Sequence, residues 1–553
     1  MKRVLSKIKY IVALPCVAMM MSSCEDFLST VPLNEIVLEN FWENESEVNS
    51  VVYSCYSRMA QGDFLTRLML WGELRSENVV EGAITGDLPY VDNNDQLKEM
   101  LKGNILQNYY IADWSCFYNV INRCNTVLHY APDVLDRDPE FKQSEWLAIE
   151  AEMLTLRALC YFYLVRSFRD VPLVLEPTID DSKPFVVAAA TPDSVLNQLV
   201  ADLKKAEVNA VVEYPETSGM YTYTKSRVTK QAVWALLADV LLWMERYDEC
   251  IVYCEKVIEA KIADAEEEQM TYSGEYPLLA NQRTGSMTNV HSAYASIFGT
   301  GFSFESIFEM PFGYNYEDKR DALRSYYGAW DRTLGCFSAS TFIAEGNELY
   351  GSNDIRKIEA FDANASSIYP INKYVATMID YDSNTKKHEV LAVRGTSYSN
   401  WIFYRLTDVM LMEAEARVER NDSVANDLRK AFNLAAAVYH RANILAEEAD
   451  TLKFNGYSTQ NVLRDFVLEE RHRELMFEGK RWFDLVRKAR REGSTSAMLD
   501  LATRKYTNPG SVKSKWIKPD MLYLPYHENE LKVNTLLEQN PEYKTDETVS
   551  TAK

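Results

Sequence analysis

Apolar residues recur at three- and four-residue steps along most of the chain, which is the pattern of amphipathic helices. Between residues 147 and 168 these positions are Leu147, Ala151, Leu154, Ala158, Tyr161, Val165 and Phe168. Residues at this spacing lie on one side of a helix. We therefore predict a long helix over 147–168 with that face buried, and a chain that is mainly helical.

Helices are also expected in pairs. Residues 229–260, TKQAVWALLADVLLWMERYDECIVYCEKVIEA, predict two helices on either side of a break at 246–248. Small residues at Ala232, Ala235 and Ala238 would let the two helices cross closely, as in a tetratricopeptide-type repeat. Similar pairs are predicted at 401–418 with 424–442, at 459–478 with 480–491, and more loosely at 147–168 with 193–207.

Long inserts separate these pairs, so we expect a degenerate scaffold over about 140–262 and 400–491, not a regular solenoid. The insert at 263–400 differs in composition, because residues 271–330 hold 13 aromatic side chains among 60 positions. A second loop-like stretch is EGAITGDLPYVDNND at 81–95. Long irregular segments of compact proteins are often functional. We predict that both inserts face a ligand.

The first 23 residues have the layout of a secretory signal. Four basic residues in positions 2–9 precede the apolar run YIVALPCVAMMM, and two small serines stand before Cys24. The run is too short to span a bilayer. It looks like a bacterial lipobox, in which Cys24 becomes the acylated first residue of the mature chain. The acidic pair at 25–26 resembles the export tag of surface lipoproteins. We predict a lipid-anchored protein of the cell outer membrane, exposed at the cell surface in view of that tag.

The chain of 553 residues carries a net charge of −22, and removal of the signal leaves about −26. So acidic a body lacks the basic face that nucleic-acid binding requires. Seven of the nine cysteines remain after cleavage and lipidation, and we expect buried free thiols. Cys250 and Cys254 lie one helical turn apart without the partners of a zinc site. The stretch DVLDRDPE lacks the glycine and the final glutamate of a calcium loop, so we expect a solvated acidic turn and no metal or cofactor.

Seven segments, in chain order, carry a resemblance to one family. They read CEDFLSTVPLNEIVLENFWENESEV, WGELRSENVV, WSCFYNVINRCNTVL, EAEMLTLRALCYFYLVRSFRDVPLV, YRLTDVMLMEAEARV, VLEERHRELMFEGKRWFDLVRKAR and YLPYHENELKVNTLLEQNPEY. On these segments the chain resembles the SusD/RagB family of Bacteroidetes outer-membrane lipoproteins. It departs from the family's usual residues at Glu77, Arg169 and Tyr526, where Asp, Gly and Ile are more usual.

The resemblance implies a non-enzymatic surface lipoprotein that captures a nutrient, usually an oligosaccharide or polysaccharide, and delivers it to a partner transporter. Family members sit as a lid over a TonB-dependent β-barrel of the SusC type, with their tetratricopeptide helices packed against it. The implied fold is mainly α: a degenerate tetratricopeptide-repeat helical scaffold with an irregular loop-rich lobe, over residues 24–553 after loss of 1–23. RagB-like members handle peptides instead, so peptide capture stays open, as does a structural surface lipoprotein.

A third alternative is an all-helical glycoside hydrolase, because Glu470, Glu474 and Glu478 lie at i, i+4 spacing on one predicted helix. Arginines interleave with these glutamates, notably Arg471 and Arg473. Such a pattern is typical of ion pairs on a helix surface or of a buried Glu–Arg network. We therefore predict a structural role for these carboxylates.

The two aromatic inserts are the better candidates for a ligand site. A sugar presents C–H faces and a rim of hydroxyls, so its site needs exposed aromatic rings beside amide, carboxylate or arginine groups. The residues that could serve are Arg75, Tyr90, Asp92, Asn93 and Asn94 from the first region and Tyr314, Tyr316, Tyr326, Tyr327 and Trp330 from the second. Trp330 and Tyr90 are the foremost candidates because they stand beside loop residues. Phe304 and Phe308 alternate like a buried strand and are excluded.

Overall fold

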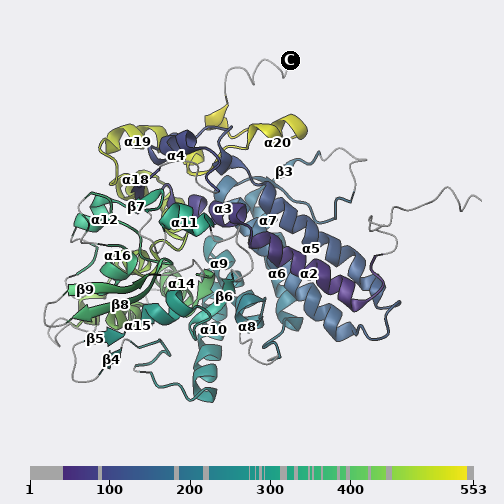
Figure 1. Cartoon of the computed structure of the whole chain (residues 1–553), viewed down its shortest axis with the longest axis horizontal. Helices are drawn as coiled ribbons and strands as arrows, with labels where there is room; N and C mark the ends of the chain where they lie inside the picture. The colour runs from purple at the N-terminus through teal and green to yellow at the C-terminus, as the bar shows by residue number, and fades with distance from the viewer. Residues whose placement is uncertain are drawn as a thin grey trace, which may run out of the picture.

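The computed structural model describes residues 41–544, apart from residues 85–89, 180–185, 216–222, 273, 281, 285–288, 292, 312–320, 329–333, 347–348, 352–353, 363–364, 366, 383–386, 394–398, 421–424 and 444–450. Most of the described chain is helical, as predicted (Figure 1). No helix in this part of the chain is long and apolar enough to cross a bilayer.

Four long helices form one side of the molecule (Figure 1). They are α2 (Glu45–Met59), α5 (Ser115–Val134), α6 (Gln143–Phe168) and α7 (Pro192–Asn209). Helix α6 contains the predicted 147–168 segment but is buried on every side from Ala151 onward. The predicted face is buried from Ala151 onward, and the structure buries the other sides of the helix as well. Neighbours α5 and α7 both pack on α6, which explains why so many of its positions are apolar.

The predicted helix pairs are present. They are α9 (Lys230–Trp243) with α10 (Tyr247–Glu267), α14 (Leu406–Glu419) with α15 (Ala425–Ala442), and α16 (Gln460–Leu475) with α17 (Arg481–Glu492). The break between α9 and α10 falls at 244–246, where Glu245 takes a positive φ of 59°. One boundary was wrong, because the first five residues of the segment 401–418 form a strand that leads into α14.

Short strands pair two by two and antiparallel, and all of these ribbons except β2–β3 include a strand of the predicted irregular lobe. The ribbons are β1 (Val79–Glu81) with β7 (Phe337–Ala339), β2 (Val171–Pro172) with β3 (Ala189–Ala190), β4 (Gln282–Thr284) with β5 (Asn289–His291), β6 (Ser306–Met310) with β10 (Trp401–Arg405), and β8 (Ala376–Asp382) with β9 (Lys387–Val393). Phe308 lies in β6 and Phe304 just before it, and both are buried, as predicted.

Shorter helices fill the space between the scaffold and the lobe. They are α3 (Gly62–Glu73), α4 (Asn94–Leu101), α8 (Tyr223–Ser226), α11 (Asp321–Tyr327), α12 (Thr341–Glu345), α13 (Arg356–Ala360), α18 (Ser496–Ala502), α19 (Pro509–Trp516), α20 (Glu528–Val533), η3 (Tyr110–Ala112), η4 (Ala295–Thr300), η7 (Phe454–Tyr457), η8 (Pro519–Leu522) and η9 (Pro541–Tyr543). Helix α11 packs on α3, and α4 contacts β1. These contacts place the two predicted inserts on the same side of the scaffold.

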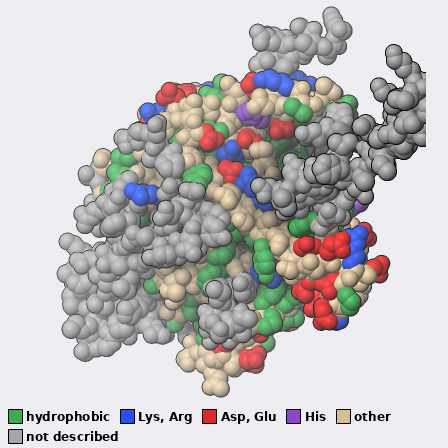
Figure 2. All heavy atoms as spheres, turned by 45° about the vertical axis from the view of Figure 1, so that its right-hand side comes forward, with side chains coloured by type: hydrophobic (Ala, Val, Ile, Leu, Met, Phe, Trp, Pro, Cys, Tyr) green, Lys and Arg blue, Asp and Glu red, His purple; other side chains and the backbone are tan. Residues whose placement is uncertain are grey.

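The N-terminal end of the described chain lies where α2 meets the turn between α5 and α6. The Glu45 backbone N–H donates to Asp138 Oδ2 at 3.0 Å, and Arg137 Nη1 donates to the Trp42 carbonyl at 3.0 Å. Acidic side chains gather on this side of the molecule (Figure 2), among them the exposed Asp133 and Asp136. The DVLDRDPE stretch is thus an acidic turn, as predicted, and the described residues contain no cluster suited to a metal ion.

The seven cysteines of the predicted mature body are all described and all buried as free thiols, as predicted. Cys250 and Cys254 have their Sγ atoms 3.9 Å apart within α10, which is the contact expected of buried thiols one turn apart. Burial raises the pKa of the Cys254 thiol well above its usual value, and the neighbouring Cys250 adds to this effect. These thiols serve the core and offer no reactive thiolate.

Candidate ligand-binding site

The two predicted ligand-facing inserts meet in the ribbon of β1 and β7. Glu81 lies opposite Phe337, and the pairing continues past the strands because the Gly82 N–H donates to the Cys336 carbonyl at 2.7 Å. The chain thereby brings residues 81–84 beside residues that are far away in the sequence. The ribbon is the element on which a site built from both inserts can form.

The second insert folds back on itself at close range. A Cβ atom at Gly335 would lie 2.2 Å from the Tyr326 carbonyl oxygen, so only glycine fits there. Gly328 and Leu334 face one another in an antiparallel bridge, which fixes both ends of the short connection between them. Three of the predicted ligand residues lie outside the described residues: Trp330, Tyr314 and Tyr316.

Tyr90 belongs to the first insert and is the first described residue after the gap at 85–89. It is partly exposed and packs against the edge of the core. Its backbone adopts a positive φ of 59°, which is uncommon for a bulky residue. The Tyr326 hydroxyl donates a hydrogen bond to the Tyr90 carbonyl at 3.1 Å. The structure thus joins Tyr90 to the second insert, although no contact with a ligand follows from this alone.

Asp92 places a carboxylate near Tyr90, with 61% of its side chain exposed. Arg67, which is 3% exposed, lies behind it with Nη2 4.0 Å from Asp92 Oδ2. The same guanidinium is 3.6 Å from Asp113 Oδ2, and its Nε donates to the Asp113 carbonyl at 2.8 Å. A buried arginine therefore lies between two solvent-facing carboxylates. This arrangement leaves carboxylate oxygens available to accept hydrogen bonds from outside.

The two predicted asparagines lie at the start of α4. Asn93 is the N-cap, and its Oδ1 accepts a hydrogen bond from the Gln96 N–H at 3.0 Å. This use of the side chain explains why an asparagine precedes the helix. Asn94 is the first helical residue and is partly exposed. Asn93 therefore has a structural duty that the sequence alone did not reveal.

Three of the predicted ligand residues are wrong as exposed side chains, because the structure buries them: Arg75, Tyr326 and Tyr327. Arg75 Nη1 donates to the Leu522 carbonyl at 2.8 Å, and its guanidinium lies 4.2 Å from the Trp482 ring centroid. The Tyr327 hydroxyl donates to the Phe477 carbonyl at 2.9 Å. The two tyrosines are buried because α11 packs against α3, so their rings belong to the core.

Three residues at the site carried no signal in the sequence: Gly62, Arg67 and Tyr110. Gly62 and Arg67 belong to α3, and Tyr110 begins η3. The Arg67 guanidinium lies 5.6 Å from the Tyr110 ring centroid. Neither α3 nor η3 belongs to the predicted inserts, and an isolated glycine, arginine or tyrosine has no distinguishing spacing. Only the fold brings them beneath Tyr90 and Asp92.

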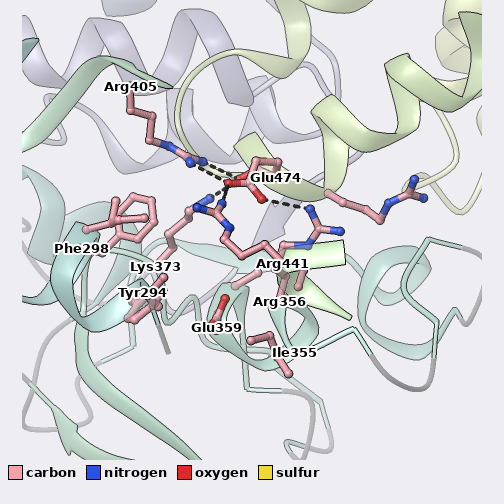
Figure 3. Close-up of a pocket in the computed structure, with 14 residues that line it drawn as sticks. Tyr294, Phe298, Ile355, Arg356, Glu359, Lys373, Arg405, Arg441 and Glu474 are labelled. Carbon is pink, nitrogen blue, oxygen red and sulfur yellow. Dashed lines mark hydrogen bonds and ion pairs between the residues drawn. The ribbon is translucent and has the colours of Figure 1, made fainter. Parts of the chain in front are cut away.

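The three glutamates form a buried ion network, and Figure 3 shows the contacts of Glu474. Glu470 and Glu474 lie in α16, but Glu478 follows the end of this helix at Leu475, so the prediction of all three on one helix is wrong. Glu474 binds Arg356 at 3.0 Å, Arg405 at 2.6 Å, and also Arg441. Glu478 binds Lys373 at 2.6 Å and Arg405 at 2.7 Å. Glu470 binds Arg356 at 2.6 Å and Arg473 at 2.8 Å. The predicted structural role is confirmed as a buried Glu–Arg network.

This network is unsuited to glycoside hydrolysis. Burial favours the neutral form of Glu474, but Arg441, Arg405 and Arg356 outweigh it and hold its pKa well below the usual range. The general acid of such an enzyme needs a raised pKa. The cavity beside these residues has a volume of about 40 Å³, which admits a few water molecules and no sugar ring. The glutamates are therefore part of the scaffold.

A larger hollow of about 430 Å³ lies at the other end of the β1–β7 ribbon. Its wall includes Glu77 and His472, which are both buried. Glu77 Oε1 accepts a hydrogen bond from Arg481 Nη2 at 2.6 Å, and His472 Nε2 lies 2.6 Å from Asn78 Oδ1. Glu77 and His472 thus bind their neighbours at the back of this hollow, and the charged residues Glu469, Asp500 and Arg504 also line it.

Two family profiles match the chain. The profile described as "SusD family" matches residues 310–543, and the profile described as "Starch-binding associating with outer membrane" matches residues 33–242. Among curated proteins, SusD-like protein P25 of Formosa agariphila is 25% identical over 93% of this chain and 95% of its own length. SusD-like protein P38 of the same organism is 23% identical over 84% of this chain and 88% of its own.

Solved structures share the fold. A SusD superfamily protein from Bacteroides vulgatus has a TM-score of 0.66 at 17% identity, covering 91% of this chain and 100% of its own. A laminarin binding SusD-like protein has a TM-score of 0.60 at 22% identity, covering 90% and 99%. B. fragilis NanU has a TM-score of 0.61 at 18% identity, covering 93% and 100%. The profiles, relatives and fold agree, and the chain belongs to the SusD/RagB family.

Proposed function

We propose that this protein captures an oligosaccharide or polysaccharide at the bacterial cell surface and delivers it to a SusC-like TonB-dependent β-barrel. The observation that carries the proposal is the convergence of the two inserts at the β1–β7 ribbon. There a partly exposed Tyr90 lies near the exposed carboxylate of Asp92. An aromatic ring next to a polar rim is the combination that a sugar requires.

Each described side chain has a distinct role in this proposal. The Tyr90 ring stacks on the C–H face of a sugar, and the Asp92 carboxylate accepts hydrogen bonds from its hydroxyls. Arg67 orients Asp92 from behind, with its Nη2 4.0 Å from Asp92 Oδ2. Trp330 supplies a second ring in the proposal, since chain connectivity keeps it within two residues of the bridged Gly328. Tyr314 and Tyr316 remain proposed ligand residues of the same insert.

The comparisons support a glycan as cargo. One family profile is described by starch binding, and one neighbour of the same fold is a laminarin binding protein. We propose capture without catalysis, because the acid–base chemistry of a hydrolase has no counterpart in the Glu474 network. The ion pairs of that network belong to the scaffold on which the site rests.

The proposal includes a lipid anchor at Cys24. Sixteen residues lie between Cys24 and Phe41, where the described chain begins, and an extended chain over these seventeen steps reaches up to about 60 Å. Phe41 lies at one end of α2, while Tyr90 lies at the other end, beside Gly62. The 15-residue helix separates the two by about 22 Å. The tether is thus attached at the end of α2 that is remote from the proposed site.

A glycan array tests the proposal, with the soluble chain lacking residues 1–24 and with product release assayed in parallel. Plant, host and microbial oligosaccharides are titrated by calorimetry against wild type, Tyr90→Ala and Trp330→Ala. The expected result is binding without products, weakened at least tenfold in both variants. Release of shortened sugars would contradict capture. If members of a peptide library bind and no glycan does, the cargo is peptide. If neither binds, a structural lipoprotein is favoured.

A further inference from the structure

Tyr90 is held in a conformation that it would not adopt by itself. A positive φ of 59° places the backbone of a bulky residue in the left-handed region. Residues in such regions persist when their surroundings fix them, and they cluster at binding sites. Two independent contacts act on Tyr90, one below its ring and one at its carbonyl. Together they determine where the ring points.

The contact below the ring is made by Gly62, the first residue of α3. A Cβ atom built on Gly62 would lie 2.4 Å from both Cε1 and Cζ of Tyr90, so the ring rests directly on the glycine. The φ of Gly62 is not in the left-handed region, so its backbone does not require glycine. Glycine in a helix is less stable than alanine by roughly 0.5–1 kcal/mol. The space that it leaves for the Tyr90 ring is therefore the physical reason for glycine at this position.

The contact at the carbonyl is a chain of two phenols. The Tyr326 hydroxyl donates to the Tyr90 carbonyl at 3.1 Å and lies 3.2 Å from the Tyr110 hydroxyl. A phenol has one proton, so Tyr110 must donate to Tyr326. Burial raises the pKa of both phenols, which keeps the chain of donors intact at physiological pH. Tyr326 is 0% exposed and Tyr110 is 6% exposed, so neither can act as an open platform for a ligand.

We infer that Gly62 and Tyr326, with Tyr110 behind it, are positioning residues that hold the Tyr90 ring for sugar stacking. Gly62 sets the height of the ring, and Tyr326 fixes the backbone from which it projects. This inference rests on the proposed function, because it assigns the ring a ligand. It makes one further claim: a single methyl group on Gly62 displaces the ring, since a side-chain end yields more readily than the helix backbone.

The first test needs no ligand. Melting temperatures are measured for wild type, Gly62→Ala, Tyr90→Ala and the double variant. Gly62→Ala is expected to lower or leave unchanged the melting temperature when Tyr90 is present. In the Tyr90→Ala background, where alanine meets no ring, Gly62→Ala is expected to raise the melting temperature by up to about a degree. An equal shift in both backgrounds would overturn the role of Gly62. Gly510→Ala is the matched control. Gly510 lies in the first turn of α19, and a Cβ atom there would meet its nearest neighbour at 3.7 Å, so the melting temperature should shift equally in both backgrounds.

The second test uses laminarin, arabinoxylan, mannan and mucin oligosaccharides as probes, and the one with the largest binding heat is titrated. Gly62→Ala and Tyr326→Phe are each expected to weaken binding at least fivefold, with no further loss in the Tyr90→Ala background. Tyr327→Phe is the control, because its hydroxyl donates to Phe477 and not to Tyr90. It should bind like wild type.

The failures of the two proposals differ. Unchanged affinity in Tyr90→Ala would remove Tyr90 from the site and would contradict the proposed function at this position. Lost affinity in Tyr90→Ala with unchanged affinity in Gly62→Ala and Tyr326→Phe would keep the site and overturn the positioning. If none of the four probes binds, the melting cycle alone decides whether Gly62 supports the ring.

Discussion

The Glu474 network and the proposed Tyr90 site both contain charged and aromatic side chains of the kinds that bind or transform ligands. They differ in how many of those groups remain free to contact a ligand. Glu470, Glu474 and Glu478 each contact cations, and the cavity beside Glu474 has a volume of only about 40 Å³. Near Tyr90 the Asp92 side chain is 61% exposed, and its arginine partner approaches from the core side at 4.0 Å. The first group is closed and mutually satisfied, while the second is open.

The difference shows that the density of reactive residue types is a poor guide to function in this chain. The sequence concentrates glutamate and arginine in the helix α16, where they stabilise the junction with β10 and α13. The proposed site around Tyr90 contains fewer charges, but its carboxylates, Asp92 and Asp113, face solvent. What separates scaffold from site is whether hydrogen-bond acceptors and ring faces remain unused by the protein itself. The predictions below test that distinction.

The largest expected effect comes from breaking the closed region. Arg405→Ala removes a side chain that is 1% exposed and binds both Glu474 and Glu478. Glu474 keeps two cations and Glu478 keeps Lys373, but both buried carboxylates lose the arginine that joins them, so the free energy of unfolding should fall by about 3 to 5 kcal/mol. Urea denaturation followed by circular dichroism measures it. Lys532→Ala, which breaks a surface pair with Glu528, is the control with no measurable change. A similar small effect of Arg405→Ala would refute the closed network.

Acid should destabilise the region around His472. Burial and then Arg481 lower the pKa of this imidazole from 6.5 to about 3. The unfolded chain binds a proton near pH 6.5 while the folded chain does not, so stability is present above pH 6.5 and is lost as pH falls toward 3. The loss should be on the order of 3 kcal/mol by pH 4. His472→Gln should show a smaller decrease between pH 6.5 and 4 in urea titrations. Parallel curves for the two proteins would contradict the shifted pKa.

At the open region, Asp92→Asn should affect binding and spare stability. The substitution keeps the size of the side chain but replaces an ionised acceptor, and hydrogen bonds to charged groups are the stronger ones. Affinity for the array-selected glycan should fall about fivefold, which is about 1 kcal/mol. Calorimetry measures it, and Asp133→Asn on the acidic turn is the matched control. Equal affinity in both variants would remove Asp92 from the site.

The smallest effect is expected at Arg169, which ends α6 with a positive φ of 70°. Glycine would relieve this backbone conformation, but it would remove the contacts of Arg169 with Asp170 and Asp520. Such partly exposed pairs contribute little. Arg169→Gly should therefore change the free energy of unfolding by less than about 1 kcal/mol in either direction. A loss of several kcal/mol would show that these contacts define the end of α6.

Helix existence and pairing could be predicted from the sequence because apolar spacing is a local property. The pairs around 229–260 and 459–491 match α9 with α10 and α16 with α17. The strand at 401–405 could not be predicted from the sequence. The apolar segment WIFYR fits the first turn of a helix as well as a strand, and in the structure it is a strand that pairs with β6. Tertiary contact decided between two local conformations there.

Within the site, the sequence identified the inserts but not the faces of their residues. Tyr326 and Tyr327 are adjacent to a loop, yet α11 turns both rings into the core. Arg75 was predicted as a ligand residue because of its place in the WGELRSENVV motif. In the structure it stacks on Trp482, which is far away in the chain. Gly62, Arg67 and Tyr110 were missed because their roles depend on contacts with Tyr90 and Asp92. Composition locates a functional segment, while side-chain direction requires the fold.

The most direct measurement is a crystal structure of the soluble chain with the glycan selected by the array. The account predicts a sugar ring stacked on Tyr90, with its hydroxyls within hydrogen-bond distance of Asp92 and the chain intact at every glycosidic bond. The Glu474 network should be unchanged and free of sugar. A glycan bound away from the β1–β7 ribbon, or cleaved beside Glu474, would contradict the assignment of site and scaffold.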